Sequence, residues 1–323
     1  MTWILTGDIG GTKTRLALLA AEDLRLGREK VYASADYGDF AALLADFLRG
    51  QDVPAVLSLG IAGPIQGRVV QTTNLPWRID ADELQARFGF AACHLLNDLE
   101  VVAWSLPVLQ DCDVRVLQVG VEQAGNRAVI AAGTGLGEAG LFWDGQRHQP
   151  FATEGGHTSF TPTDAVEFDL LQQLQTEFGH VSWERVVSGM GIVSLYRFLR
   201  ARSGVAEPDW LQAELATQDV GAVVSRAAAA GSDAVCVETL RRFACLYGAE
   251  AGNLALKVMS RGGLYLGGGI APKILPWLES GLFMQAFLHK GRMRHLLEAM
   301  PVKVILNERA GLLGAAHFAR QAG

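Results

Sequence analysis

Apolar runs that end in glycine recur along this chain and predict strands followed by sharp turns. The apolar residues 3–6 lead into a glycine-rich turn at 7–12, and residues 15–19 resume the apolar pattern. This pattern predicts a β-hairpin at the N-terminus. The same order of run, glycine turn and run returns at 128–142. Two hairpins roughly 125 residues apart indicate an internal duplication of one α/β half.

After the first hairpin, apolar strand patterns alternate with helical ones, as in an α/β domain. The expected elements are helices at 39–48, 80–88 and 99–106 and strands at 56–61 and 94–96. Asp98 follows directly on the second of these strands, so we expect it at a strand-to-helix junction.

The second half is richer in helical patterns. The expected elements are helices at 164–178, 190–200, 232–258 and 311–320 and a strand at 263–266. Ser188 is a candidate N-cap for the second of these helices. The final helix could cross back to the first half of the chain.

Composition narrows the class of protein. The 323 residues favour two domains of about 100–200 residues each, with a cleft between them. The net charge of −6 offers no basic surface for nucleic acid. No apolar run reaches the roughly 18 residues that a membrane span needs. Four widely spaced cysteines, none in a Cys-x-x-Cys pair, are typical of reduced thiols in a cytoplasmic protein.

Three glycine turns at strand ends are candidate phosphate-binding sites. The first, at 7–12, combines backbone N–H groups with Asp8 and the Thr12 hydroxyl, which suits a polyphosphate and Mg²⁺ held through water. The alternative is a glycine hairpin with a solvated Asp8. A second turn lies at 133–137 and a third at 267–272. The second also matches a dinucleotide fingerprint by spacing, but a strand pattern follows where that motif requires a helix.

Several polar side chains could bind a polyol or act as a base. Asp98 at the end of an apolar strand could sit partly desolvated in a cleft, whereas its alternative role is a helix N-cap. Glu154 and His157 lie beside glycines, and Glu184 lies in a polar segment. With Asn74 they form a set that can donate and accept several hydrogen bonds to hydroxyl groups.

At this point the chain resembles the bacterial glucokinases of the actin, Hsp70 and hexokinase superfamily. The resemblance runs through nearly the whole chain, in the same order. The segments that carry it are 7–18, 61–64, 96–98, 132–137, 154–157, 184–189, 267–270 and 311–314.

The resemblance implies an α/β, two-domain actin-like ATPase (ribonuclease H-like) fold with an interdomain cleft. The smaller domain would span 1–108 and be joined by the C-terminal helix 310–323, and the larger would span 109–309. It also implies a homodimer with ATP and Mg²⁺ as cofactors and glucose as substrate.

Site residues follow residue by residue from the same resemblance. Asp98 matches the catalytic base, and Asp8 would lie near Mg²⁺. The expected sugar-binding residues are Asn74, Asn97, Asp98, Glu154, His157 and Glu184. The expected ATP-binding residues are Gly7, Asp8, Ile9, Gly10, Gly11, Thr12, Gly133, Thr134, Gly135, Gly267, Gly268 and Gly269.

The chain also departs from its relatives. Lys13 and Thr14 stand where bacterial glucokinases of this group usually have Asn-Ala, and Met190 stands where a proline is usual. Related sugar kinases and repressors carry a cysteine-rich zinc loop after the position of His157. This chain has residues 158–162 without cysteine there, so we expect no structural zinc.

These observations predict transfer of the γ-phosphoryl group of MgATP to the 6-hydroxyl of glucose. Three alternatives stay open. The acceptor could be mannose, fructose or an N-acetylated sugar, and the donor could be polyphosphate or ADP. A sugar-responsive regulator on the same scaffold would normally need a DNA-binding segment before the first strand, where only a few residues precede Gly7.

Overall fold

The computed structural model describes residues 2–63, 65–72 and 75–322. The chain divides into two compact units. Unit 1 comprises Met1–Asp113, Pro150–Ala152 and Asn307–Gly323, and unit 2 comprises Val114–Gln149 and Thr153–Leu306.

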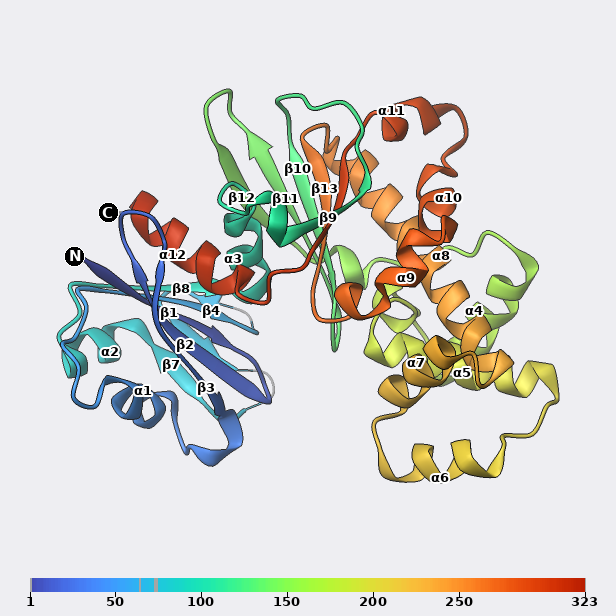
Figure 1. Ribbon diagram of the computed structural model, residues 1–323, viewed down its shortest axis with the longest axis horizontal. Coiled ribbons are helices and arrows are strands. Elements are labelled where there is room, and N and C mark those ends of the chain that lie inside the picture. The colour runs from blue at the N-terminus through green and yellow to red at the C-terminus, as the bar shows by residue number, and fades with distance from the viewer. Residues whose placement is uncertain (1, 64, 73–74, 323) are drawn as a thin grey trace. The chain divides into compact units, whose positions relative to one another are not determined.

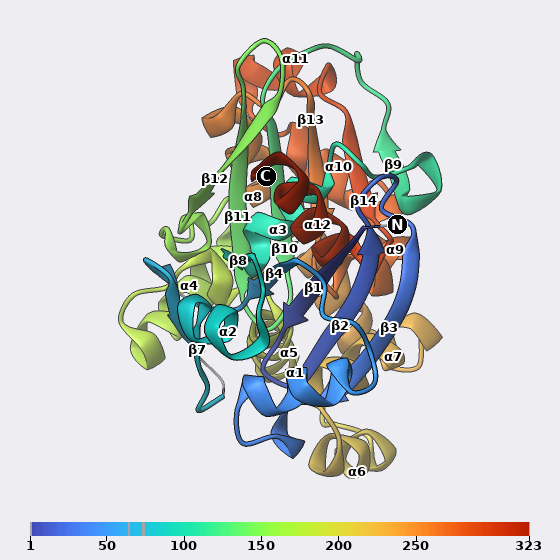
Figure 2. The same cartoon turned by 90° about the vertical axis from the view of Figure 1, so that its left-hand side faces the viewer.

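The described part of unit 1 contains a five-stranded sheet in the order β3-β2-β1-β4-β8 (Figure 2). The strands are β1 (Trp3–Ile9), β2 (Lys13–Ala20), β3 (Leu26–Ala33), β4 (Val56–Ile61) and β8 (Ala92–Asn97). The first three form an antiparallel meander, while β4 and β8 continue parallel to β1. The carboxyl ends of β1, β4 and β8 therefore share one edge of the sheet.

Helices cover both faces of this sheet (Figure 1). On one face lie α1 (Phe40–Leu48) and α2 (Ala81–Phe88), whose buried side chains join those of β1 and β4 in one core. On the other lie α3 (Asp98–Ser105) and α12 (Ala310–Ala322). Shorter elements are η1 (Ser34–Asp36), η2 (Asp111–Asp113) and the small sheet of β5 (Ile65–Gln66), β6 (Val69–Gln71) and β7 (Arg78–Asp80).

The C-terminal helix α12 returns to the first half of the chain, which confirms the sequence prediction. It packs against β1, β4 and α3. Gly314 makes the close approach to α3 possible, because a Cβ atom there would overlap the carbonyl oxygen of Val101 and lie 2.8 Å from the nitrogen of Ser105.

Among the described residues the second sheet has six strands in the order β12-β11-β10-β13-β14-β9, all of them in unit 2 apart from Pro150–Ala152 of β12. The strands are β9 (Val114–Gln118), β10 (Arg127–Ala132), β11 (Leu136–Trp143), β12 (His148–Thr153), β13 (Gly263–Gly267) and β14 (Val302–Ile305). The order β12-β11-β10-β13-β14 repeats that of unit 1, with β9 added at the edge. In both sheets an antiparallel hairpin is followed by two parallel strands, which agrees with the duplication expected from the two hairpins.

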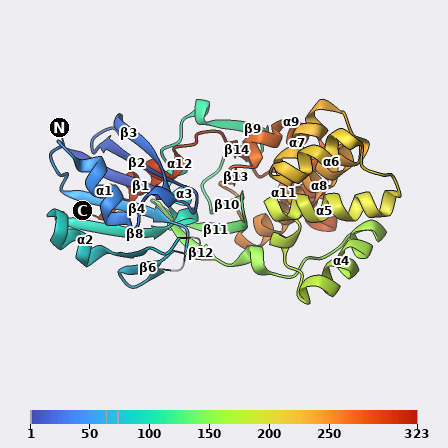
Figure 3. The ribbon, with the colours of Figure 1, turned by 90° about the horizontal axis from the view of Figure 1, so that it is seen from below.

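Helices gather in unit 2 around the long helix α8, which packs against α5, α7 and α10 (Figure 3). The α-helices are α4 (Ala165–Phe178), α5 (Gly189–Ser203), α6 (Asp209–Thr217), α7 (Val220–Ala230), α8 (Ala234–Val258), α9 (Leu275–Glu279), α10 (Leu282–Leu288) and α11 (Arg294–Glu298). The short 3₁₀ turns are η3 (Gly155–His157), η4 (Trp183–Arg185), η5 (Ala271–Ile274) and η6 (Gly291–Met293). Ser188 caps α5 by accepting from the N–H of Gly191, as expected.

Two turn boundaries predicted from the sequence are wrong. Strand β1 continues through Gly7, Asp8 and Ile9, so the first turn is confined to residues 10–12. Gly7 is required for packing, since its Cβ would lie 2.6 Å from a methyl carbon of Leu59. Likewise β11 begins at Leu136, two residues earlier than expected, because pairing with β10 already starts there.

Among the described residues no single helix has the length and apolar composition of a membrane span. Helices α7 and α8 pass that test only as a pair, across a bend of 103°.

Candidate functional site

Unit 1 places Asp8 and Asp98 at the carboxyl-end edge of its parallel strands. Asp8 is the last residue but one of β1, and Asp98 is the first residue of α3, directly after β8. The strand-to-helix junction predicted for Asp98 is confirmed. Asn97 is the N-cap, because its side chain accepts the N–H of Leu99. The N-cap alternative for Asp98 is therefore wrong, although its Oδ1 also accepts from Leu99, at 2.9 Å.

Burial raises the pKa of both carboxyl groups. Burial, and next the charge of Asp98, raise the pKa of Asp8 to about 6, against the lowering effect of Arg15. Burial also raises the pKa of Asp98, although backbone hydrogen bonds oppose it and part of the side chain reaches solvent. Gly311 of α12 would bring a Cβ to 3.5 Å from the Asp8 carboxylate, so this helix covers it closely.

This donor set fits a hydrated divalent cation. A cation would relieve the repulsion between two partly desolvated carboxylates, and Mg²⁺ usually takes only one or two protein carboxylates beside water and phosphate. Within the described ranges no group of three or more His, Cys, Asp or Glu side chains is arranged to hold a metal ion.

Unit 2 brings together three of the predicted sugar-binding residues. The imidazole of His157 lies between two carboxylates: Nδ1 is 3.6 Å from Oε2 of Glu154, and Nε2 is 4.0 Å from Oε1 of Glu184. Glu154 and His157 are largely exposed, whereas the side chain of Glu184 is 20% exposed. Glu154 and His157 therefore present polar atoms to solvent, next to the more buried carboxylate of Glu184.

Glu184 is anchored by the second glycine turn. Its Oε2 accepts the N–H of Leu136 at 2.9 Å. Gly135 makes room for this contact, because a Cβ there would overlap Oε2 and lie 3.2 Å from Cδ. The predicted sugar-binding and phosphate-binding segments are thus in direct contact within unit 2.

The glycine turns are held by backbone and hydroxyl hydrogen bonds. In the first turn Gly10 donates to the carbonyl of Lys13 at 3.0 Å, and Ser34 Oγ donates to the carbonyl of Gly10 at 3.1 Å. In the second, Gly189 donates to the carbonyl of Gly133 at 2.8 Å. The third packs on the same strand end as the second, since Ile270 donates to the carbonyl of Ala132 at 3.2 Å.

The other sequence-predicted residues are distributed as follows. Asn74 lies outside the described residues. Asp8, Asn97, Asp98 and the first turn belong to unit 1, while Glu154, His157, Glu184 and the second and third turns belong to unit 2. An arrangement of these two groups around one cleft stays a prediction.

Sequence reasoning missed Glu138 and Glu250. Both carboxyl groups are buried in unit 2, with Glu138 as the third residue of β11. A charged residue inside an otherwise apolar strand was the available signal, because a buried carboxyl group needs a partner.

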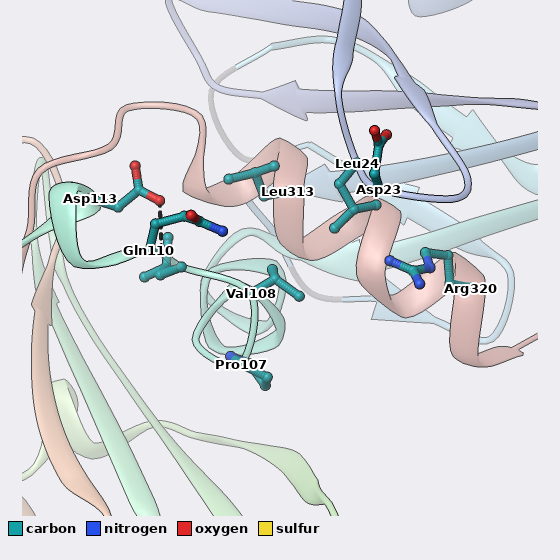
Figure 4. Close-up of a pocket in the computed structure, with 9 residues that line it drawn as sticks. Asp23, Leu24, Pro107, Val108, Gln110, Asp113, Leu313 and Arg320 are labelled. Carbon is teal, nitrogen blue, oxygen red and sulfur yellow. Dashed lines mark hydrogen bonds between the residues drawn. The ribbon is translucent and has the colours of Figure 1, made fainter.

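A cavity of about 380 Å³ lies apart from these residues, in unit 1 (Figure 4). It is lined by Asp23, Leu24, Pro107, Val108, Leu109, Gln110, Asp113, Leu313 and Arg320. The Asp113 carboxylate accepts both the backbone N–H of Gln110 and the side chain of Asn307, so it is already satisfied. None of the predicted site residues that the structure describes lines this cavity.

The repeated hairpin-led sheet, with glycine turns at its strand ends, defines the actin-like ATPase fold of the sugar kinases. Comparison with known proteins identifies the family of sugar kinases to which the chain belongs. The sequence model of the glucokinase family matches residues 5–322. The glucokinase of Nostoc punctiforme is 44% identical over 335 aligned positions, covering 98% of each chain.

Solved structures agree. A glucokinase from an Antarctic psychrotroph superposes with a TM-score of 0.87 at 32% identity, covering 99% of each chain. The glucokinase of Balamuthia mandrillaris, solved in complex with glucose, has the same fold, with a TM-score of 0.81 at 24% identity over 99% of this chain and 94% of that one. The chain belongs to the glucokinase family, and the family and fold predicted from the sequence are confirmed.

Proposed function

We propose that this chain transfers the γ-phosphoryl group of MgATP to the 6-hydroxyl of glucose, giving glucose 6-phosphate and ADP. The observation that carries the proposal is the contact between Glu184 and the second glycine turn, together with His157 and Glu154 beside it. A segment suited to hydroxyl groups and one suited to phosphate meet there, as phosphoryl transfer to a sugar requires.

Glucose is bound in this proposal by Asn74, Asn97, Asp98, Glu154, His157 and Glu184. Carboxylates accept from adjacent sugar hydroxyls, and the imidazole and amides can also donate. Glu184 is an acceptor held in place by the main chain, since its Oε2 accepts the N–H of Leu136 while its Oε1 lies beside Nε2 of His157, on the side proposed for the sugar.

Asp98 is the base. The N-cap role of Asn97 and the start of α3 fix its backbone, and its carboxylate takes the proton of the 6-hydroxyl as that oxygen attacks the γ-phosphorus in line. The pKa of Asp98 is raised by burial, which makes it a better proton acceptor than a fully solvated carboxylate.

The phosphates lie along the glycine turns. Gly10 and Gly133 close their turns through their own N–H groups. The N–H groups of Gly11, Thr12, Thr134 and Gly135 donate to phosphate oxygens, with Gly267, Gly268 and Gly269 beside the adenosine. Asp8 would hold Mg²⁺ through water, and the ion would neutralise charge on the phosphates. Gly7 and Ile9 act only through strand β1, since both lie within it.

The proposal also covers the domain boundaries, the compartment and the oligomeric state of the enzyme. The smaller domain is 1–108 with helix 310–323, the larger is 109–309, and the active site is the cleft between them. The enzyme is cytoplasmic and a homodimer. Small-angle scattering with and without glucose would test both the dimer and closure of the cleft.

Asp98→Asn tests the base, because it keeps shape and hydrogen bonding while removing the proton acceptor. We expect kcat to fall roughly 10²–10⁴-fold, while glucose binding measured by calorimetry stays near that of the wild type. Asp52→Asn, an exposed aspartate elsewhere in unit 1, is the matched control and keeps full activity. Near-normal turnover of Asp98→Asn would refute the assignment.

A matrix of initial rates tests donor and acceptor together. Glucose, mannose, fructose and N-acetylglucosamine are each combined with ATP, ADP or polyphosphate. The proposal requires the highest kcat/KM for glucose with ATP, and a higher value for any other pair would overturn it.

A further inference from the structure

Strand β11 contacts both segments of unit 2 that contain predicted sugar-binding residues. The N–H of Leu136 holds Glu184, as described. The carbonyl of Glu138 accepts the hydroxyl of Thr153 at 2.9 Å, and the same hydroxyl oxygen accepts the N–H of Gly155 at 3.2 Å. Residues 136–138 are therefore the support of the turn that presents Glu154 and His157.

The side chain of Glu138 lies directly beneath this turn. It is 2% exposed. A Cβ at Gly155 would overlap its Oε2 and lie 2.7 Å from its Cδ, so the backbone of the turn rests on this carboxyl group. Its Oε1 is buried and receives no hydrogen bond from any donor among the described residues. A group so placed needs a proton of its own to make a bond.

Glu250 of α8, which is 0% exposed, lies within hydrogen-bonding reach of the Glu138 carboxyl group and supplies the acceptor. Its Oε2 accepts from Asn253 at 2.8 Å, and its Oε1 lies 3.5 Å from Nζ of Lys257. Lys290 approaches from another segment but donates to Asn253 and to the carbonyl of Ala249. Glu250 is thus the carboxyl group of the pair with a cation beside it, and it keeps the negative charge.

We propose that Glu138 is a positioning residue of the glucose site: protonated, it donates to the Glu250 carboxylate and so holds the turn that carries Glu154 and His157. This inference rests on the proposed function. One shared proton removes the repulsion between two buried carboxylates and satisfies the oxygen that otherwise has no donor.

The proton makes sugar binding sensitive to alkaline pH. Burial, followed by the charge of Glu250, raises the pKa of Glu138 to about 8, against the lowering effect of Lys257. The other titratable groups that face the pair are Tyr247, beside Glu138, and Lys290, beside Glu250. Below pH 8 the pair carries one negative charge; above it Glu138 ionises, the two carboxylates repel, and the turn loses its support.

The test measures glucose binding and kinetics between pH 6.5 and 9.5. In the wild type we expect the KM for glucose to rise about tenfold from pH 7 to 9, because pH 9 lies one unit above the pKa of Glu138 and leaves about a tenth of it protonated. The kcat should change less. Calorimetry in buffers of different ionisation enthalpy should show proton uptake on glucose binding near pH 8.5, because sugar favours the supported turn and hence protonated Glu138.

Glu138→Gln supplies a permanent amide donor to Glu250 in the same shape. We expect a flat KM profile over this range and no proton uptake. Glu250→Gln should also flatten the profile, since an amide–carboxylate pair replaces the carboxyl pair. Glu238→Gln, on the exposed side of the same helix, loses one charge without touching the pair and should keep the wild-type profile.

The inference is overturned if Glu138→Gln retains the wild-type rise in KM, or if its only effect is an equal loss of kcat at every pH. Failure of the proposed function is seen separately, as absence of glucose binding and turnover in the wild type at pH 7. Thermal unfolding at pH 7 verifies that each variant is folded before its profile is compared.

Discussion

Gly135→Ala tests the contact between the sugar-binding carboxylate and the second glycine turn. The backbone at this position is outside the positive-φ region, so alanine fits the main chain. Its methyl group would overlap Oε2 of Glu184 and lie 3.2 Å from Cδ. Carbon atoms in ordinary contact are about 3.5–4.0 Å apart, so Cδ must retreat by roughly 0.5 Å and Oε2, which is closer still, by about 1 Å. It would then lose the bond from Leu136.

The magnitude follows from that lost bond. A hydrogen bond to a charged group contributes about 1.5–3 kcal/mol. If Glu184 can no longer be held for the sugar, the same free energy corresponds to a KM for glucose raised about 10- to 150-fold. The fold should survive, because the flexible end of one side chain moves and no backbone is displaced.

The assay is a coupled measurement of ADP release, in which glucose and ATP are varied separately. Gly38→Ala is the control, since Gly38 has no atom within 4 Å of a built Cβ and lies outside both turns. An unchanged KM for glucose, or an effect on the KM for ATP alone, would refute the coupling between Glu184 and the turn.

Two further predictions concern stability. Gly314→Ala should lower the free energy of unfolding by about 3 kcal/mol or more, because the new Cβ meets the backbone of Val101 and Ser105, which cannot move aside. Urea unfolding measures this loss. A change below about 1 kcal/mol would contradict the close packing of α12 on α3. Asp233→Asn should cost about 3–5 kcal/mol, because Arg200 at 2.7 Å is left buried without its partner. Burial opposes ionisation of Asp233, but the hydrogen bonds from Arg200 and Cys236 together outweigh it and lower its pKa. Wild-type stability therefore falls as pH drops through that lowered pKa, whereas Asp233→Asn should lack this component in urea unfolding from pH 2 to 6.

The local pattern predicted the elements that carry the site. Apolar runs and caps gave β4, β10, α1 and α5 to within a few residues, because periodicity and capping chemistry are local properties. The same reasoning placed Asp98 at its junction. It could not show that Gly7 is needed for packing inside the sheet, since that depends on Leu59, which lies far along the chain but on the neighbouring strand.

The sequence by itself determined the family, the glycine turns and the residue types available for sugar and phosphate, because these depend on the order and spacing of motifs along one chain. Only the tertiary structure decided that Leu136 anchors Glu184 and that Glu138 lies beneath Gly155 against Glu250. Those contacts join residues about 17 to 112 positions apart, and burial changes what a carboxyl group does only after the chain has excluded water from it.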